Sequence, residues 1–182
     1  MAYNMPTVTS KLLTFGPGVL YLGVAGATPT VEVGSVEAKM SIGVKRTSLE
    51  LYQGSPATLV EKVCTKEEVD VSFTGLELNL VNLKYALGAG ELSNGDKTMG
   101  FGGDMDYSNV ALKFVHQTAA GGTVTVSLWA ANGSGEASLD FGEEWTKFPL
   151  KFSGKQSATD WAGATLAAKQ QIFKIVMQDP PM

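Results

Sequence analysis

The chain has few of the residues on which catalytic and metal centres most often depend. Its 182 residues include one cysteine, Cys64, and one histidine, His116. A single cysteine excludes a disulfide within the chain, and these two residues are too few for the common zinc sites. We therefore expect Cys64 to be a small buried or half-buried side chain and His116 to lie in the core or an interface.

Charged residues are also scarce, and basic residues are not in excess. Lys and Arg number 14 against 18 Asp and Glu, which leaves a net charge of −4. A protein that holds nucleic acid neutralises phosphates with a basic excess, so composition argues against that class. No stretch approaches about 18 apolar residues, and residues 1–10 lack the charged start and apolar run of a signal peptide. We expect a soluble protein that binds no membrane and is not secreted.

Motifs of the common catalytic and phosphate-binding sites are missing as well. The sequence contains no Gly-x-Ser-x-Gly elbow and no Walker-type Gly-Lys-Ser/Thr loop. Residues 104–108 begin like a calcium loop, but Asn109 and Val115 stand where Gly and Glu are needed. The carboxylate pairs at 67–68 and 143–144 are adjacent in sequence, and adjacent strand residues point to opposite faces. We therefore expect no enzyme, no metal and no cofactor.

What the sequence does contain is alternation of apolar and polar residues with a period of two. Residues 35–46 place apolar side chains on one face and polar ones on the other, and residues 68–74 do the same. This pattern is typical of strands that pack a core on one side and meet water on the other. The apolar members are Val36, Ala38, Met40, Ile42 and Val44 in the first segment and Val69, Val71 and Phe73 in the second.

The rest of the chain predicts further strands and one helix. Residues 78–87 have helical spacing and stop at Gly88, and residues 110–117 and 123–130 predict a β-hairpin around 120–122. Other strands are expected at 12–15, 19–24, 49–52, 59–74, 148–152 and 172–177, with turns at 16–18, 26–29, 53–56 and 94–96, and with residues 156–168 as a short helix or an irregular arm.

The order of several segments carries a resemblance to a known family. These segments are the long strand at 34–46, the loop Gly54-Ser55-Pro56, residues 66–77 running into 79–88, and the closing runs 148–152 and 172–175. In this order the chain resembles, over nearly its whole length, the tail tube protein of long-tailed bacteriophages. The resemblance implies a mainly β fold of two packed antiparallel sheets, a sandwich or partial barrel, with one flanking α-helix and extended loop and terminal arms. No linker divides the chain, so residues 1–182 are expected to form one domain.

The resemblance also implies a function, that of a structural virion protein without enzymatic activity or cofactor. Members of the family assemble into hexameric rings that stack into the hollow phage tail tube, through which DNA passes on ejection. The implied partners are other copies of the chain, the tape measure protein and tail-end proteins, with DNA only in transit and no sequence-specific binding. The protein is made in the host cytoplasm and ends in the virion. Six subunits at −4 each carry about −24, which is consistent with repulsion of DNA.

The polar faces of the two alternating strands are the candidates for the channel wall. A strand that lines a large closed barrel is apolar toward the subunit core and polar toward the lumen. Lys39 and Lys45 do not suit a wall that must not hold phosphates. Either acids of neighbouring strands or subunits pair with them, or the strand faces the lumen over part of its length. The lumen-facing candidates are Glu37, Lys39, Ser41, Lys45, Glu68, Asp70, Ser72 and Thr74.

The segment 46–58 is the candidate for contact with the adjacent ring. The sequence predicts an extended loop or hairpin here, between the two long strands. The alternative interpretation of the segment is a mobile surface loop that makes no contact with another ring. Residues 1–11 and residues 155–182, which include the closing strand, are candidates for further arms. Long strands with few prolines also leave open edges that pairing with the next subunit would cover. The inter-ring candidates are Thr47, Glu50, Tyr52, Gln53, Gly54, Ser55 and Pro56.

A β-sandwich binding module is the alternative hypothesis, either a capsid decoration protein or a carbohydrate binder. It would use Trp129 or Trp161 as a platform, and together with Trp145 these residues could form a stacking surface. Aromatic residues are more often core or subunit contacts. An enzyme with a scattered acidic site is a third hypothesis. Size-exclusion chromatography with negative-stain imaging separates the first two, because rings or tubes support the first and a compact monomer that shifts on sugar titration supports the second.

Overall fold

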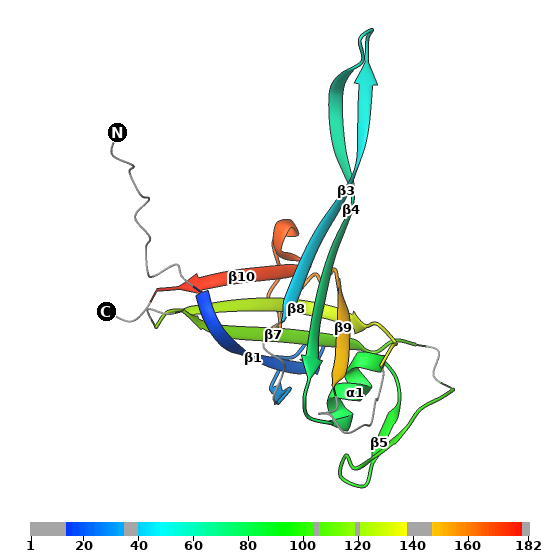
Figure 1. Cartoon of the computed structure of the whole chain (residues 1–182), viewed down its shortest axis with the longest axis vertical. Coiled ribbons are helices and arrows are strands. Elements are labelled where there is room, and N and C mark those ends of the chain that lie inside the picture. Colours follow the sequence, from blue (N-terminus) through cyan, green and yellow to red (C-terminus); the bar gives the residue numbers. More distant parts are fainter. Residues whose placement is uncertain (1–13, 35–39, 104–105, 119–120, 138–146, 180–182) are drawn as a thin grey trace.

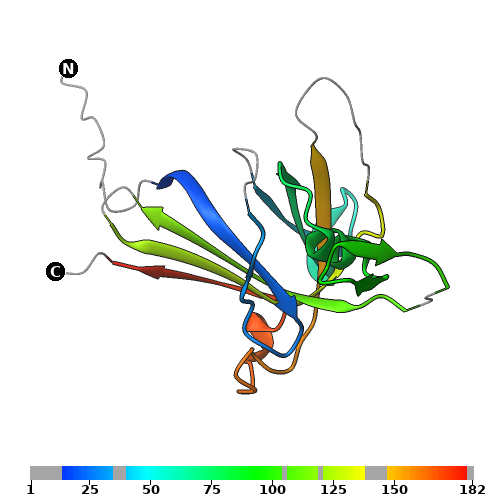
Figure 2. The same cartoon turned by 90° about the horizontal axis from the view of Figure 1, so that it is seen from below.

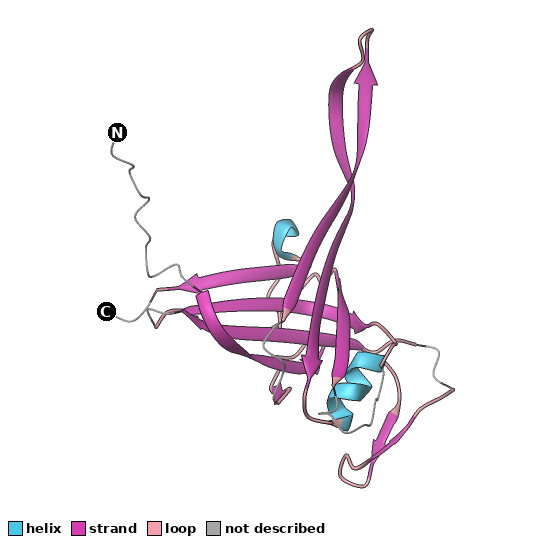
Figure 3. Cartoon of the chain, viewed as in Figure 1, coloured by secondary structure: helices cyan, strands magenta, loops and turns pink. Residues whose placement is uncertain are grey.

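The computed structural model describes residues 14–34, 40–103, 106–118, 121–137 and 147–179. Strands dominate this part of the chain (Figure 3), as the alternating pattern predicts. The elements are β1 (Thr14–Val24), β2 (Val31–Glu32), β3 (Ser41–Gln53), β4 (Thr58–Gly75), α1 (Leu80–Leu87), β5 (Glu91–Ser93), β6 (Thr98–Gly100), β7 (Asn109–Thr118), β8 (Thr123–Gly133), β9 (Phe148–Lys155), the 3-10 helix η2 (Ala168–Gln170) and β10 (Phe173–Gln178).

One antiparallel sheet of eight strands forms the body of the molecule. Its strand order is β2-β1-β7-β8-β9-β4-β3, and β10 also pairs with β8. Strand β8 pairs with β10 from Thr123 to Leu128 and with β9 from Ala130 to Gly133. The strands β1, β7, β8 and β10 run across β3, β4 and β9 (Figures 1 and 2), so the sheet folds into two layers. The predicted fold class is confirmed, and the two layers are halves of one continuous sheet.

The core lies between these two layers. Strand β4 contributes Val71 and Phe73, which lie opposite Phe152 and Leu150 of β9. The rings of Phe73 and Phe152 stack with their centroids 5.9 Å apart, and Phe152 is fully buried. These side chains belong to one cluster with Leu112 and other apolar residues of β1, β7 and β8. The alternation predicted for residues 68–74 therefore places apolar side chains in the core.

Helix α1 covers one end of this core. Asn79 caps its start, because the Asn79 side chain accepts a hydrogen bond from the Val81 N–H at 2.9 Å. Gly88 ends the helix in the left-handed conformation with φ 71°, which confirms the stop predicted from the sequence. Gly133 of β8 runs so close to the helix that an added Cβ would overlap the carbonyl oxygen of Ala86. A glycine is needed where this strand passes the helix backbone.

The turn predicted at 16–18 is wrong. Residues 14–24 form the single strand β1, whose register against β7 shifts between Thr14 and Gly18. An added Cβ at Gly18 would overlap the ring of Phe114 on the neighbouring strand. The strand therefore continues through an irregularity of the kind that a β-bulge provides, and the glycine permits its close approach to Phe114. The turn predicted at 94–96 is confirmed between β5 and β6.

The segment between β9 and β10 is irregular, with η2 as its short 3-10 turn. It folds back onto β8, where the Trp129 Nε1–H donates to the carbonyl oxygen of Gln170 at 2.7 Å. Trp161 packs edge-on against Trp129 with ring centroids 4.8 Å apart. The closing strand predicted at 172–177 is β10. The N-terminal arm expected at 1–11 lies outside the described residues.

We predict that replacing Phe152 with Ala lowers the free energy of unfolding by about 3–5 kcal/mol, because the change leaves a cavity between the two layers. Phe101→Ala is the matched control, since Phe101 is 66% exposed and the same truncation there should change stability by less than about 0.5 kcal/mol. Urea unfolding followed by circular dichroism measures both. Equal effects of the two substitutions would contradict this assignment of the core.

Candidate functional site: the projecting hairpin and its polar base

The hairpin formed by β3 and β4 projects far beyond the rest of the molecule (Figure 1). Its two strands remain paired as far as Gln53 and Thr58 at the tip. Strand β4 pairs with β9 only from Asp70 onward, and all its residues from Thr58 to Glu67 are exposed. The segment 46–58, predicted as an extended loop or hairpin, is thus strand, turn and strand within a hairpin. We call residues 48–64 the outer hairpin.

The outer hairpin exposes large apolar side chains on both of its strands. Leu49 lies directly opposite Val63, so these two side chains are neighbours on one face. From Leu51 to Val60 the tip contains no charged residue. Exposed apolar side chains concentrated on one element favour a contact site for another protein. The exposed fractions are Leu49 69%, Leu51 58%, Tyr52 54%, Leu59 46%, Val60 57% and Val63 50%.

Just below the tip, one carboxylate joins both strands of the outer hairpin. The Lys62 Nζ lies 2.6 Å from Glu50 Oε1, and the Tyr52 hydroxyl donates to Glu50 Oε2 at 2.6 Å. These hydrogen bonds, first that of Lys62 and then that of Tyr52, lower the pKa of Glu50 below its ordinary value. The bond to Glu50 raises the pKa of Lys62 and also that of Tyr52. The predicted inter-ring residues Glu50 and Tyr52 therefore lie together.

The predicted polar face is present at the base of the hairpin. Ser41 lies opposite Ser72 across the ladder, and opposite residues project to the same face of a sheet. Strand β9 extends this face with Lys151 and Ser153, and the Ser153 hydroxyl donates to Asp70 Oδ1 at 2.7 Å. The structure brings the described candidates together: Ser41, Lys45, Glu68, Asp70, Ser72 and Thr74. Glu37 and Lys39 lie outside the described residues.

Acidic residues lie near Lys45, the described lysine that does not suit a wall facing DNA. The cross-strand neighbour of Lys45 is Glu68, whose Oε1 is 2.7 Å from Lys66 Nζ. On the opposite face Arg46 Nε lies 2.8 Å from Glu67 Oε1. Exposed ion pairs contribute little to stability. Their effect here is to balance positive charge along the hairpin, and the carboxylate across the ladder from Lys45 is shared with Lys66.

The apolar face of β3 extends beyond the part of the strand that the core covers. Met40 and Ile42 pack against the core, but Val44 is 55% exposed. Val44 lines a groove of about 880 Å³ between the hairpin and the C-terminal segment, together with Val69, Ile172, Phe173 and charged residues at its rim. We call it the crook groove. Val44 was expected on the core face, and it lies on that face beyond the part that the other layer covers.

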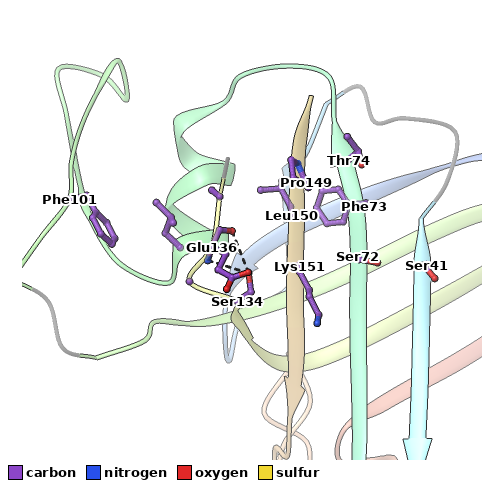
Figure 4. Close-up of a pocket in the computed structure, with 13 residues that line it drawn as sticks. Ser41, Ser72, Phe73, Thr74, Phe101, Ser134, Glu136, Pro149, Leu150 and Lys151 are labelled. Carbon is purple, nitrogen blue, oxygen red and sulfur yellow. Dashed lines mark hydrogen bonds between the residues drawn. The ribbon is translucent and has the colours of Figure 1, made fainter. Parts of the chain in front are cut away.

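A second groove, of about 1120 Å³, lies beside the polar face (Figure 4). Thr74 and Lys151 line one side of it, and Phe101 comes from the segment after β6. Its charged side chains are Glu136 and Lys151, and no histidine or cysteine is among the described residues that line it. The sequence carries no local signal for this groove, because the residues that line it come from separate elements.

The single cysteine and the single histidine differ in their exposure to solvent. Cys64 is exposed, which makes the prediction of a buried or half-buried thiol wrong. The reason is its place in the outer hairpin, opposite Ser48 and away from the body. His116 is buried as predicted, and its ring stacks on that of Phe114 at a centroid distance of 6.3 Å.

The tryptophan platform of the alternative hypothesis is largely covered. Trp129 is 7% exposed, because Trp161 and Gln170 pack over it. Trp145 lies outside the described residues. In the described ranges, no three His, Cys, Asp or Glu side chains gather where they could hold a metal ion. The same ranges contain no helix of the length and apolar character needed to cross a membrane.

The comparisons with known proteins identify no family. The chain matches no protein-family model and no curated protein. The projecting hairpin, its exposed apolar residues and its polar base are therefore the observations from which a function is inferred.

We predict that Lys62→Met raises the pKa of Glu50 toward its ordinary value of about 4.3, because the substitution removes the hydrogen bond that lowers it most. Carboxyl NMR titration of Glu50 measures the change. Lys66→Met is the matched control, since Lys66 pairs with Glu68 and its loss should leave Glu50 unchanged.

The direction of the pH effect follows from the lowered pKa. A carboxylate with a lowered folded pKa stabilises the folded hairpin above its unfolded pKa, and this contribution is lost as pH falls through the folded value. The contact between Lys62 and Glu50 should therefore persist at neutral pH and disappear only in acid. A Glu50 pKa at or above the ordinary value in the native chain would contradict the contact.

Proposed function

We propose that this protein is the tail tube subunit of a long-tailed bacteriophage, a structural virion protein whose copies form hexameric rings stacked into a hollow tube. The observation that carries the proposal is the outer hairpin, which projects from the body with exposed apolar side chains on both strands. Exposed apolar surface costs about 25 cal/mol per Å² relative to burial. A contact that covers the outer hairpin removes this cost, and repeated contacts between copies build a tube.

The outer hairpin is long enough to act outside its own subunit. Its strands pair for several residues beyond the last contact with β9, and its tip carries no charge between Leu51 and Val60. An uncharged tip can enter another protein without leaving an unpaired charge buried. We assign it to the contact with the adjacent ring.

The polar base supports the assignment of a channel wall. Hydroxyls and acids of β3 and β4 share one face, and Lys45 has Glu68 beside it, so the face offers little net positive charge to phosphates. The net charge of −4 per chain also disfavours attraction of DNA phosphates. DNA would pass this wall without being retained, and the tape measure and tail-end proteins would be the further partners of the tube.

The binding-module alternative has less support. Of its two platform residues, Trp129 is nearly covered by Trp161 and the segment before β10, and Trp161 is half-buried. A sugar-binding platform needs an open aromatic face, and neither of these tryptophans is among the exposed large apolar side chains. The structure offers the alternative no observation of equal weight.

We predict that the purified wild-type protein forms rings or tubes in negative-stain micrographs, and that a hairpin-shortened variant does not. Residues 50–62 are replaced by Asn-Gly, which closes the strands after the opposed pair Leu49 and Val63 with a two-residue turn. The body should stay folded, since the deleted residues are all exposed. Long tubes from this variant would contradict the assignment of the hairpin.

Point substitutions supply the matched control for this deletion. Leu51→Lys places a charge among the exposed apolar side chains of the outer hairpin and should reduce tube formation at least about tenfold, as read from sedimentation and electron microscopy. Val24→Lys places the same charge on a residue of similar exposure in the body, 62% against 58% for Leu51. Both variants should unfold at the wild-type urea concentration, so that a difference in assembly reflects the contact and not the fold.

A further inference from the structure

The crook groove has an apolar floor that the described chain leaves open to solvent at one end. Val44 is 55% exposed and lies opposite Val69, so the two side chains share one face of the ladder. An added Cβ at Gly154 of β9 would lie 3.2 Å from Ile172 Cγ2 and 3.3 Å from Val69 Cβ, which places Ile172 beside Val69. The floor is therefore a continuous apolar strip that ends at the exposed Val44.

The wall of the groove that faces the hairpin is held in place by hydrogen bonds. The Ser157 N–H donates to the carbonyl oxygen of Gln171 at 2.8 Å, and the Gln156 Nε2 donates to Gln171 Oε1. The bond from Trp129 to the carbonyl oxygen of Gln170 fixes the adjoining residue. The groove is thus already formed in the single copy, and a preformed site loses less conformational freedom when it binds a partner.

The rim of the crook groove carries an excess of positive charge. Its basic residues are Arg46, Lys66 and Lys169, and its acidic residue is Glu67. Arg46 pairs with Glu67 and Lys66 pairs with Glu68, whereas Lys169 has no ion pair among the described residues. Complementary charge selects the partner of such a surface. An apolar floor with a basic rim therefore fits a peptide segment that combines apolar and acidic side chains.

Residues 139–145 of the chain have this composition, and we call them the acidic segment. Their sequence is Leu-Asp-Phe-Gly-Glu-Glu-Trp, which contains three carboxylates, three large apolar side chains and no basic residue. The acidic segment lies outside the described residues. Residues 67–73 have a similar composition, but they are paired within the hairpin and Glu67 belongs to the groove itself. The acidic segment is therefore the candidate occupant.

The acidic segment cannot reach the crook groove of its own chain. Ala137, just before it, lines the second groove together with Pro149 at the start of β9, whereas Gln156, just after β9, lines the crook groove. The 8 residues of β9 separate these two places by about 25 Å, at about 3.3 Å per residue. Half of the chain between Ala137 and Lys147 must lead out and half must lead back, so the segment reaches about 17 Å from its ends. Its partner groove must belong to another copy.

We propose that the crook groove of one copy binds the acidic segment of a second copy. Apolar side chains of the segment cover the floor at Val44, and its carboxylates meet the basic rim at Lys169. The two surfaces differ, so the contact is head-to-tail and leaves each copy with a free groove or a free segment for the next. This inference rests on the proposed function for a regular array of copies, and it names a pair of surfaces that join them.

Binding of a synthetic peptide tests the groove directly. The peptide has the sequence of residues 138–146 with fluorescein at its N-terminus, and its partner is the full-length chain with the acids of its own segment neutralised, so that the groove stays open. We expect saturable binding in fluorescence polarisation that weakens as salt is added. A peptide with the same neutralisations should bind at least about fivefold more weakly, because the rim loses its charge partners. The neutralising substitutions are Asp140→Asn, Glu143→Gln and Glu144→Gln.

Substitutions in the groove have matched controls elsewhere on the surface. In the same full-length variant, Lys169→Glu should weaken binding of the peptide at least about fivefold, because like charges then meet at the rim. Lys97→Glu makes the same change of net charge at an exposed residue between β5 and β6 and should leave binding unchanged. Val44→Ser should weaken binding, whereas Val24→Ser, at a residue that is 62% exposed, should not. Circular dichroism checks that each variant is folded. Equal losses within either pair would overturn the inference.

Cys64 reports where the peptide binds, since its thiol is exposed and lines the crook groove. A bromoacetyl group replaces fluorescein at the N-terminus of the peptide and alkylates a nearby thiol. We expect labelling of Cys64 at least about tenfold faster than with the neutralised peptide, because binding raises the effective concentration of the reactive group. Mass spectrometry of the digested protein measures both rates. Equal rates with the two peptides would count against the groove as the binding place.

The outcomes separate this inference from the proposed function. Tubes in micrographs without binding of the acidic peptide would overturn the inference while the proposed function stands. Saturable binding by a protein that forms neither rings nor tubes would support the pairing of groove and segment and contradict the proposed function. If a peptide of residues 50–62 bound the groove in place of the acidic peptide, the groove would belong to the outer hairpin of another copy and the inference would be wrong.

Discussion

Strand β8 pairs along one edge with two different strands, and the architecture of the molecule depends on this. Strand β10 occupies the first part of that edge and β9 the last part. Since β9 also pairs with β4, the sheet leaves the plane of β8 and folds over itself, with Phe73 and Phe152 enclosed between the layers. Because β4 follows β9 out of the plane of β8, its outer part extends beyond the body, where it pairs with β3 in the projecting hairpin.

The hairpin combines two kinds of surface that a monomer would seldom maintain. Apolar side chains are exposed toward the tip, while ion pairs such as Arg46 with Glu67 run along the shaft. The ion pairs contribute little to stability in water, but they leave no row of like charges that would repel a second copy. Exposed apolar side chains near an uncharged tip, above a charge-balanced shaft, are consistent with a contact element whose environment is supplied by other molecules.

The sequence alone determined which face of each strand is apolar, because a period of two places alternate side chains on opposite sides whatever the strand packs against. It therefore predicted the core residues Val69, Val71 and Phe73, the shared polar face and the helix stop at Gly88. Only the tertiary structure decided what covers each face. Exposed Cys64, covered Trp129 and the continuous strand through Gly18 depend on contacts between segments far apart in the chain, and no local pattern records such contacts.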